Sequence, residues 1–473
     1  MKKYLSDFFP KKLNDVSFWL LSIVVVFPIL RMFIDYDYMI MNFTFLCLCT
    51  IYFLVNFVMK IIKGKKMYKI KSCAFFWLLI MLLLMFIGSF FSYNPKATWL
   101  GIFRDHHQEI SVFQFAFFVL IATLGILLDK GNIKALIYEF ITVALIIICI
   151  HIANQKYYIS FVNRNFAGYY LCTTLTLSVC LLLFSENIFE SIYLSIATVM
   201  HFIILVLNGS FGPILAVLCY LVVGFIYFLI HKRYLIFRFI TICLACFSIF
   251  SIFDFVPKLS KYKCEKQTII DQLYDVSFVV LNKVGIIDKK TFEKIEQGVD
   301  NEGNKKDDVV VGGSVIIQSG ITAGAKGYDR FDMWERCLDN MKERPLFGVG
   351  AGAWWTYNPD MPNSHPHNEY LQIGSSFGIP VLSIYVGVII YILIKFRIKH
   401  KKCSNLAFVV CGAMIVYLIQ AFFGILQPFT AQLSFLLIGL TIKFVDKKDE
   451  DEIEYYNLKL ERKLNSNIRK IKN

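Results

Sequence analysis

The sequence predicts an all-α, polytopic integral membrane protein. Of its 473 residues, 57% are hydrophobic and only 18% are charged, well below the quarter that is usual in soluble domains. Apolar stretches of about 20 residues, the length that crosses a bilayer as a helix, recur along almost the whole chain. Because these stretches are spread along the sequence, a single polytopic domain is favoured over a soluble enzyme with one anchor.

Hydropathy predicts about twelve membrane-spanning helices. They cover residues 17–34, 40–62, 73–92, 109–128, 134–153, 166–184, 188–207, 211–231, 235–254, 368–395, 404–424 and 428–445. The basic segment before the first span lacks a small-residue cleavage site, so we interpret it as a retained cytoplasmic tail. The predicted domains are nine spans in 1–254, a large extracytoplasmic loop in 255–367, three spans in 368–445 and a cytoplasmic tail in 446–473.

The lysines predict the orientation in the membrane. The most lysine-rich connections are residues 60–71, 129–134, 231–238 and 395–403. With a cytoplasmic N-terminus all four fall inside, as the positive-inside rule requires, and the C-terminus is cytoplasmic as well. The net charge of +14 is thereby explained by topology, and nucleic acid is not an expected partner.

The large outer loop divides into two parts. Residues 255–328 are charged at first and glycine-rich later, which predicts an irregular insertion. Residues 329–344 predict an amphipathic helix on the outer membrane face, stopped by Pro345. Its apolar positions are Phe331, Trp334, Leu338 and Met341. Cys264 and Cys337 either pair in this loop or stay as free thiols.

A first group of candidate functional residues stands directly ahead of the tenth span. His365 and His367 flank Pro366, and Asn368 and Glu369 follow. Histidine suits general-base work because its unperturbed pKa is about 6.5. The alternative is that these polar side chains only anchor the helix end at the membrane interface.

Arginines form a second group of candidates. Arg330 begins the predicted amphipathic helix, Arg344 ends it, and Arg104 lies in another outer loop. A guanidinium offers a planar fork for phosphate oxygens and stays charged, and a helix N-terminus adds partial positive charge at Arg330. Alternatively, Arg330 and Arg344 are ordinary surface arginines and Arg104 is an interfacial anchor.

Two further motifs carry weaker signals. The run "GVGAG" at 348–352 lacks the ending of a phosphate loop, and it predicts a tight chain reversal instead. His106 and His107, with Asp105 or Glu109, are a weak signal for a metal. We expect neither a metal nor a cofactor.

Residues 327–381 hold an arginine, a helix with a tryptophan, "PLFGVGAG" and "HNEYLQIGSSFGIP" in this order. This compound motif resembles the characteristic stretch of the O-antigen ligase and polymerase family. "SYNPKATWLGIFRDHHQEI" is similar, more loosely, to the outer loop that precedes the family's fourth span. "SFVNRNFAGYYL" is similar in the same way to the start of another span.

The resemblance implies a bacterial plasma-membrane glycosyltransferase of cell-surface polysaccharide biosynthesis that uses an undecaprenyl-diphosphate-linked glycan as donor. It implies that His367 is the catalytic histidine and that Arg330 engages the lipid diphosphate, with Arg104 as a further candidate. Where the family often has "TGSRG", this chain has "NGSFG" at 208–212. Either a second diphosphate contact is missing here, or Arg164 supplies it from the neighbouring outer loop.

The residues themselves favour the same chemistry. A lipid diphosphate is a good leaving group, so transfer needs cations on the phosphates and a base near the acceptor hydroxyl. We expect His367 to take the proton and Arg330 and Arg104 to bind the diphosphate, without a metal and with inversion. Asn368 or Glu369 would then orient the histidine, and His365, Arg344 and Arg164 are further candidate substrate contacts.

Several readings of the function stay open. The acceptor is a glycan, a lipid or a protein, so ligase, polymerase and protein O-oligosaccharyltransferase are not separated by the sequence. A transporter or flippase of lipid-linked glycans is the alternative from another class. Such a protein places ionisable groups near the midplane of the bilayer; His151 and His201 lie there, with few acidic residues.

Overall fold

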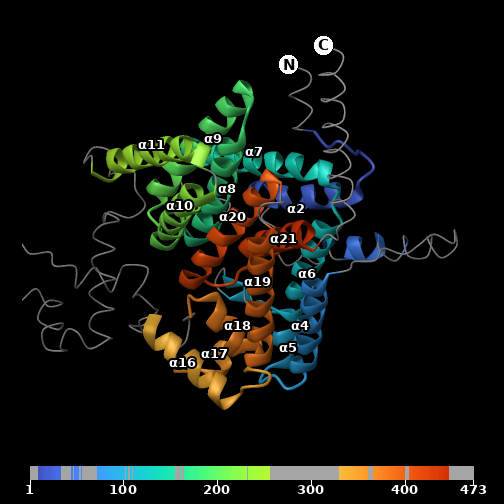
Figure 1. Ribbon diagram of the computed structural model, residues 1–473. Helices are drawn as coiled ribbons and strands as arrows, with labels where there is room; N and C mark the ends of the chain where they lie inside the picture. The colour runs from blue at the N-terminus through green and yellow to red at the C-terminus, as the bar shows by residue number, and fades with distance from the viewer. Residues whose placement is uncertain are drawn as a thin grey trace, which may run out of the picture.

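The computed structural model of the chain describes residues 9–33, 44–45, 47–52, 55, 72–101, 103–104, 107–108, 110–154, 161, 164–231, 233–255, 330–360, 366–399 and 404–446. Its long helices are α2 (Val16–Phe33), α4 (Cys73–Ser89), α6 (Val112–Leu127), α7 (Lys130–Asn154), α8 (Arg164–Phe184), α9 (Ile188–Asn208), α10 (Phe211–His231), α11 (Ile236–Phe255), α19 (Ile379–Lys399), α20 (Asn405–Gln420) and α21 (Pro428–Val445) (Figure 1). The short elements are α5 (Pro95–Leu100), α16 (Arg330–Glu343), α17 (Trp354–Tyr357), α18 (Glu369–Phe377), two 3-10 turns (Arg233–Leu235 and Ala421–Phe423) and the antiparallel strands β1 (Phe103–Arg104) and β2 (His107–Gln108).

The predicted class, an all-helical polytopic membrane protein, is confirmed in this architecture. Six helices are long and apolar enough to cross a membrane: Lys130–Ala153, Asn165–Phe184, Ile188–Asn208, Gly212–Ile230, Ile379–Lys399 and Asn405–Phe423. Five shorter apolar helices stand at other predicted spans: Val16–Leu30, Cys73–Ser89, Val112–Leu127, Ile236–Cys246 and Thr430–Val445. The predicted second span lies largely outside the described residues, so the total of twelve stays a prediction.

The connections between helices lie at two ends of the bundle. At the first, which we call the tail end, Lys12 forms an ion pair of 2.6 Å with Asp129. At the same end Arg238 donates from Nη1 to the carbonyl oxygen of Ser185 at 2.9 Å. These contacts join segments next to predicted lysine-rich connections.

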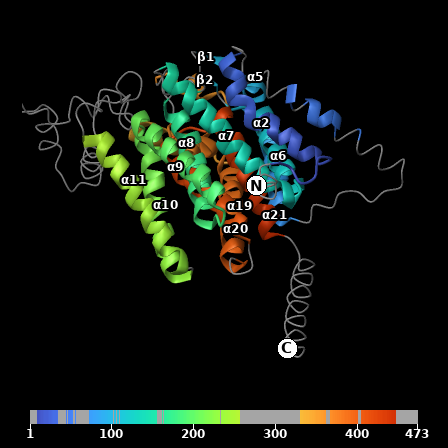
Figure 2. The same ribbon diagram turned by 90° about the horizontal axis from the view of Figure 1, so that it is seen from above.

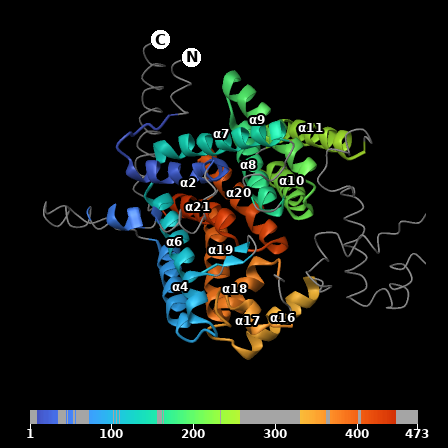
Figure 3. The same ribbon diagram turned by 180° about the vertical axis from the view of Figure 1, so that it is seen from behind.

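The opposite end, which we call the site end, holds the polar segments. There Tyr93 N donates to the carbonyl oxygen of Val349 at 3.0 Å, and Leu426 N donates to Gln372 Oε1 at 2.8 Å. Figure 1 shows α5, α16, α17 and α18 together at the foot of the molecule, away from α2, α7 and α9, and Figure 3 shows α16, α17 and α18 there from behind. Chain segments more than 250 residues apart therefore meet at the site end.

The core of the bundle depends on close backbone approach between α6 and α21. A Cβ on Gly439 of α21 would lie 2.2 Å from the carbonyl oxygen of Ala122 in α6, and one on Gly125 would lie 3.2 Å from Leu440 N. Small residues at helix crossings let backbones approach in this way in membrane proteins. Figure 2 shows α6 and α21 side by side in the view from above.

The predicted tenth span, 368–395, is not one helix. Gly378 has φ 89° and separates α18 from α19. A Cβ on Gly378 would lie 2.3 Å from the carbonyl oxygen of Leu346, and Ile379 N donates to the carbonyl oxygen of Pro345 at 2.8 Å. The helix breaks because the chain after α16 crosses at this point, which hydropathy alone does not reveal.

The glycine-rich run 348–352 makes the predicted tight reversal and joins three segments. Val349 N and Gly350 N both donate to carbonyl oxygens at the end of α18, each at 2.9 Å. On the other side, Thr98 Oγ1 of α5 donates to the carbonyl oxygen of Ala351 at 2.9 Å. The loop thus fixes α18 relative to α5, and with it the start of the segment that contains Arg104.

We expect Gly350→Ala to destabilise the protein. Gly350 has φ 101°, and a Cβ there would lie 1.8 Å from Ser92 Oγ and 2.6 Å from Thr98 Oγ1. Backbone strain and overpacking each cost about 1–3 kcal/mol. Thermal unfolding in detergent followed by fluorescence should show a clearly lowered midpoint. Gly387→Ala is the matched control, because its Cβ meets nothing within 4 Å; an equal midpoint for both variants would contradict the prediction.

Candidate functional site

His367 occupies an unusual backbone position at the head of α18. Its φ is 46°, and it is the only residue other than glycine with a positive φ among those that the structure describes. The chain is fixed on both sides: Trp334 Nε1 donates to the carbonyl oxygen of Pro366 at 2.6 Å. Asn368 Oδ1 accepts from Leu371 N at 3.0 Å and caps α18. Such strained positions persist where the surroundings impose them, often at functional sites.

Glu369 points into the helical bundle. It is fully buried, and its two oxygens accept from Tyr385 at 2.6 Å and from Tyr417 at 3.1 Å. These tyrosines belong to α19 and α20, so the carboxyl group pins α18 to two long helices. Because Asn368 caps the helix and Glu369 bonds to tyrosines, both stabilise the backbone next to His367. Whether either residue also orients the imidazole stays a prediction.

Burial of Glu369 predicts a pH-dependent stability. Desolvation raises the pKa of this carboxyl, in α18 ahead of the membrane-length helix α19, from 4.5 to about 7. The folded state then holds a proton that the unfolded state has lost. Stability should therefore fall as the pH rises from about 4.5 to 7, by on the order of 3 kcal/mol, and level off above that. Glu369→Gln should remove this slope in thermal unfolding series. An unchanged slope in the variant would assign the dependence to other groups.

Arg344 joins the end of α16 to the end of α4. Its Nη2 donates to the carbonyl oxygen of Phe91 at 3.2 Å, and the rings of Phe91 and Phe347 stack at 4.8 Å. Arg344 Nη1 is buried without an acceptor within the described ranges. This geometry gives Arg344 a packing contact, and its predicted role in binding substrate stays a prediction.

The other predicted site residues are placed by their backbone or lie outside the description. Arg330 is the first residue of α16, Arg164 the first of α8, and Arg104 stands in β1. His365 lies outside the described residues, as do residues 256–329, which hold Cys264 and nearly all of the predicted insertion 255–328. Cys337 is a free, fully buried thiol whose pKa burial raises.

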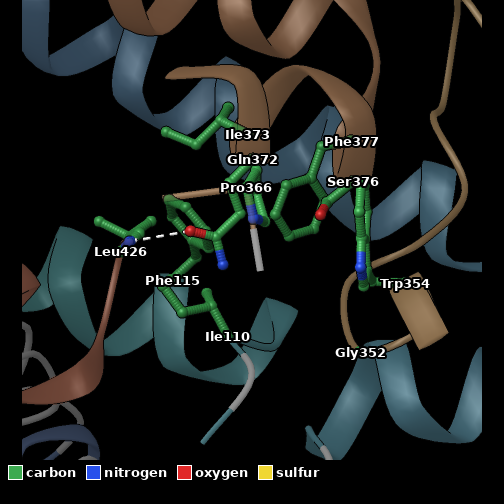
Figure 4. Close-up of a pocket in the computed structure, with 10 residues that line it drawn as sticks. All are labelled: Ile110, Phe115, Gly352, Trp354, Pro366, Gln372, Ile373, Ser376, Phe377 and Leu426. Carbon is green, nitrogen blue, oxygen red and sulfur yellow. Dashed lines mark hydrogen bonds between the residues drawn. The ribbon is translucent and has the colours of Figure 1, made fainter. Parts of the chain in front are cut away.

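A pocket opens beside His367, and sequence reasoning had not proposed the residues that line it. They are Ile110, Phe115, Gly352, Trp354, Pro366, Gln372, Ile373, Ser376, Phe377 and Leu426 (Figure 4). The polar members are few: the amide of Gln372, the indole N–H of Trp354 and the hydroxyl of Ser376. Gln372 follows Asn368 by four residues, one helical turn, and this spacing was the sequence signal that could have identified Gln372 as a site residue.

Fold and site define a helical, polytopic membrane protein with a strained histidine, His367, directly ahead of the short helix α18 and next to a pocket. The resemblance to the O-antigen ligase and polymerase family is confirmed, since the model of the O-antigen ligase family matches residues 196–386. The match includes α16, the glycine-rich run, His367 and α18. The match supports a membrane protein of the glycosyltransferase or ligase type. No curated protein matches the chain.

Proposed function

We propose that this protein transfers a glycan from undecaprenyl diphosphate to an acceptor hydroxyl during cell-surface polysaccharide synthesis in the bacterial plasma membrane. The observation that carries the proposal is the position of His367. It lies at a strained, doubly fixed point, beside a pocket and one short helix before the membrane-length helix α19. A lipid-linked donor can keep its tail in the bilayer there while its head group reaches the imidazole.

In the proposed reaction the acceptor oxygen attacks the anomeric carbon of the donor sugar. The bond from that carbon to the diphosphate oxygen breaks, and its electron pair leaves with the phosphate. His367 takes the hydroxyl proton. Arg330 and Arg104, with Arg164 as a further contact, stabilise the charge on the leaving diphosphate. A single displacement inverts the configuration at the anomeric carbon, and the arginines supply the positive charge without a divalent metal.

The proposed orientation places the site end outside the cytoplasm and both chain termini inside. It is supported by the position of the lysine-rich connections near the tail end, where Lys12 contacts Asp129 and Arg238 contacts Ser185. The donor glycan would thus be used on the face of the membrane where surface polysaccharides are assembled.

The direct test incubates the purified protein with an undecaprenyl-diphosphate glycan and candidate acceptors. Lipid diphosphate released with a longer sugar product indicates a polymerase. A new conjugate with a lipid or a protein indicates a ligase or an O-oligosaccharyltransferase. Movement of the intact lipid-linked glycan across a vesicle membrane without release of lipid diphosphate would favour a flippase and overturn the proposal.

A further inference from the structure

We propose that the pocket beside His367 is a subsite for an uncharged, hydroxyl-bearing sugar residue of the glycan, recognised by Gln372 and Trp354. The inference rests on the proposed glycosyl transfer and identifies the place where one sugar residue of the glycan is bound. One wall of the pocket is Pro366, the residue directly before His367. A sugar held there would lie next to the backbone that carries His367.

The orientation of the Gln372 amide is fixed by its neighbour. Leu426 N can only donate, and it donates to Gln372 Oε1 at 2.8 Å. The oxygen of the amide must therefore face Leu426, and its NH₂ group is left free to face the pocket that Gln372 lines (Figure 4). The same bond holds the α20–α21 connection against α18, so the donor stands on a rigid support.

Trp354 supplies a second hydrogen-bond donor. Its side chain is 6% exposed, and its Nε1 is buried with no acceptor among the described residues. Indole N–H is a donor only, and a buried donor without a partner costs about 1–3 kcal/mol. Figure 4 shows Gln372 and Trp354 on either side of the Phe377 ring. Two oxygen atoms of a ligand, one at each donor, would satisfy both N–H groups.

The lining of the pocket favours a sugar over a phosphate. Apart from its polar members the wall is apolar, with Ile110, Phe115 and Phe377 among the described lining residues, and none of those residues is cationic. A phosphate is normally bound by charged donors. A sugar offers C–H surface for aromatic rings and neutral oxygens for N–H groups, which is the combination found here.

The test uses two substitutions in the full-length protein. Gln372→Glu keeps an oxygen for Leu426 N but replaces the NH₂ donor by a carboxylate oxygen. Trp354→Phe keeps an aromatic ring and removes the N–H. The probes are the lipid-linked glycan extracted from the source cells, as donor, and the same glycan released by mild acid. Calorimetry measures the Kd of the released glycan, and initial rates are recorded in separate donor and acceptor series.

We expect Gln372→Glu to raise the Kd by about 5- to 100-fold and Trp354→Phe by about 2- to 10-fold. A matching rise of KM in the acceptor series assigns the subsite to the acceptor sugar, and a rise in the donor series assigns it to the donor sugar. Gln114→Glu is the matched control: Gln114 Oε1 also accepts a backbone N–H, from Ser111 at 3.0 Å, but Gln114 does not line the pocket.

The failures of the two proposals are distinguishable. If the parent transfers glycan and both variants keep its Kd and KM values, the subsite is wrong and the reaction stands. If the parent binds the glycan but transfers none, and the variants bind it more weakly, the subsite stands and the reaction is wrong. Parental values in Gln114→Glu together with loss in both pocket variants support the subsite directly.

Discussion

Replacing His367 with asparagine should reduce glycan transfer by about 100-fold to 10,000-fold, the range expected when a general base is lost. Asparagine tolerates positive φ better than most residues, so the backbone at φ 46° should survive the change. The loss should appear in kcat, since the imidazole acts on the proton that moves in the transition state. Single-turnover formation of product from a lipid-linked glycan is the measurement.

Two controls separate this effect from misfolding. The thermal midpoint of His367→Asn should match that of the parent. His231→Asn changes a histidine at the end of α10 next to a lysine-rich connection and should transfer glycan at the parental rate. If His367→Asn keeps more than a tenth of the parental kcat, then His367 is not the base.

Removal of the guanidinium at Arg330 should cost about 100- to 1,000-fold in transfer rate, as for other groups that stabilise developing charge. Arg330 opens α16, where the partial positive charge of the helix N-terminus adds to its own. Arg330→Lys should recover part of the loss, because lysine restores the charge without the planar fork. Rates of undecaprenyl diphosphate release give the comparison.

Arg336 provides the matched control in the same helix. It forms an exposed ion pair with Asp360, and such pairs contribute at most about 1 kcal/mol. Arg336→Ala should therefore leave the transfer rate within about two-fold of the parent. Equal losses in Arg330→Ala and Arg336→Ala would show that α16 needs arginines for folding or membrane binding rather than for the diphosphate.

Hydropathy and helical spacing predicted most of the fold because both depend on local composition. The described long helices agree with the predicted spans to within a few residues at most boundaries, and α16 lies where the spacing of Trp334 and Met341 placed it. The break at Gly378 was missed because its cause is the crossing of Leu346, a contact that neither stretch of sequence contains alone.

The candidate site was predictable only in part, because local patterns in the sequence reveal some of its residues and contacts between distant segments supply the others. The run from Pro366 to Glu369 could be predicted as a site because polar residues cluster there directly before an apolar helix. Gln372 and Trp354 became candidates only when the structure brought the α20–α21 connection and α17 to the same pocket. The tyrosines that bind Glu369 sit on two other helices, and no spacing along the chain reveals that pairing.

The bonds from the glycine-rich run to Tyr93 and Thr98 have a consequence for biosynthesis. Tyr93 and Thr98 are synthesised early, but their partners Val349 and Ala351 follow more than 250 residues later, so these hydrogen bonds can form only late in synthesis. Until the ribosome has delivered that later segment, the early helices cannot complete a working centre. A polypeptide that ends before residue 349 would lack the hydrogen bonds that fix α5 against α18.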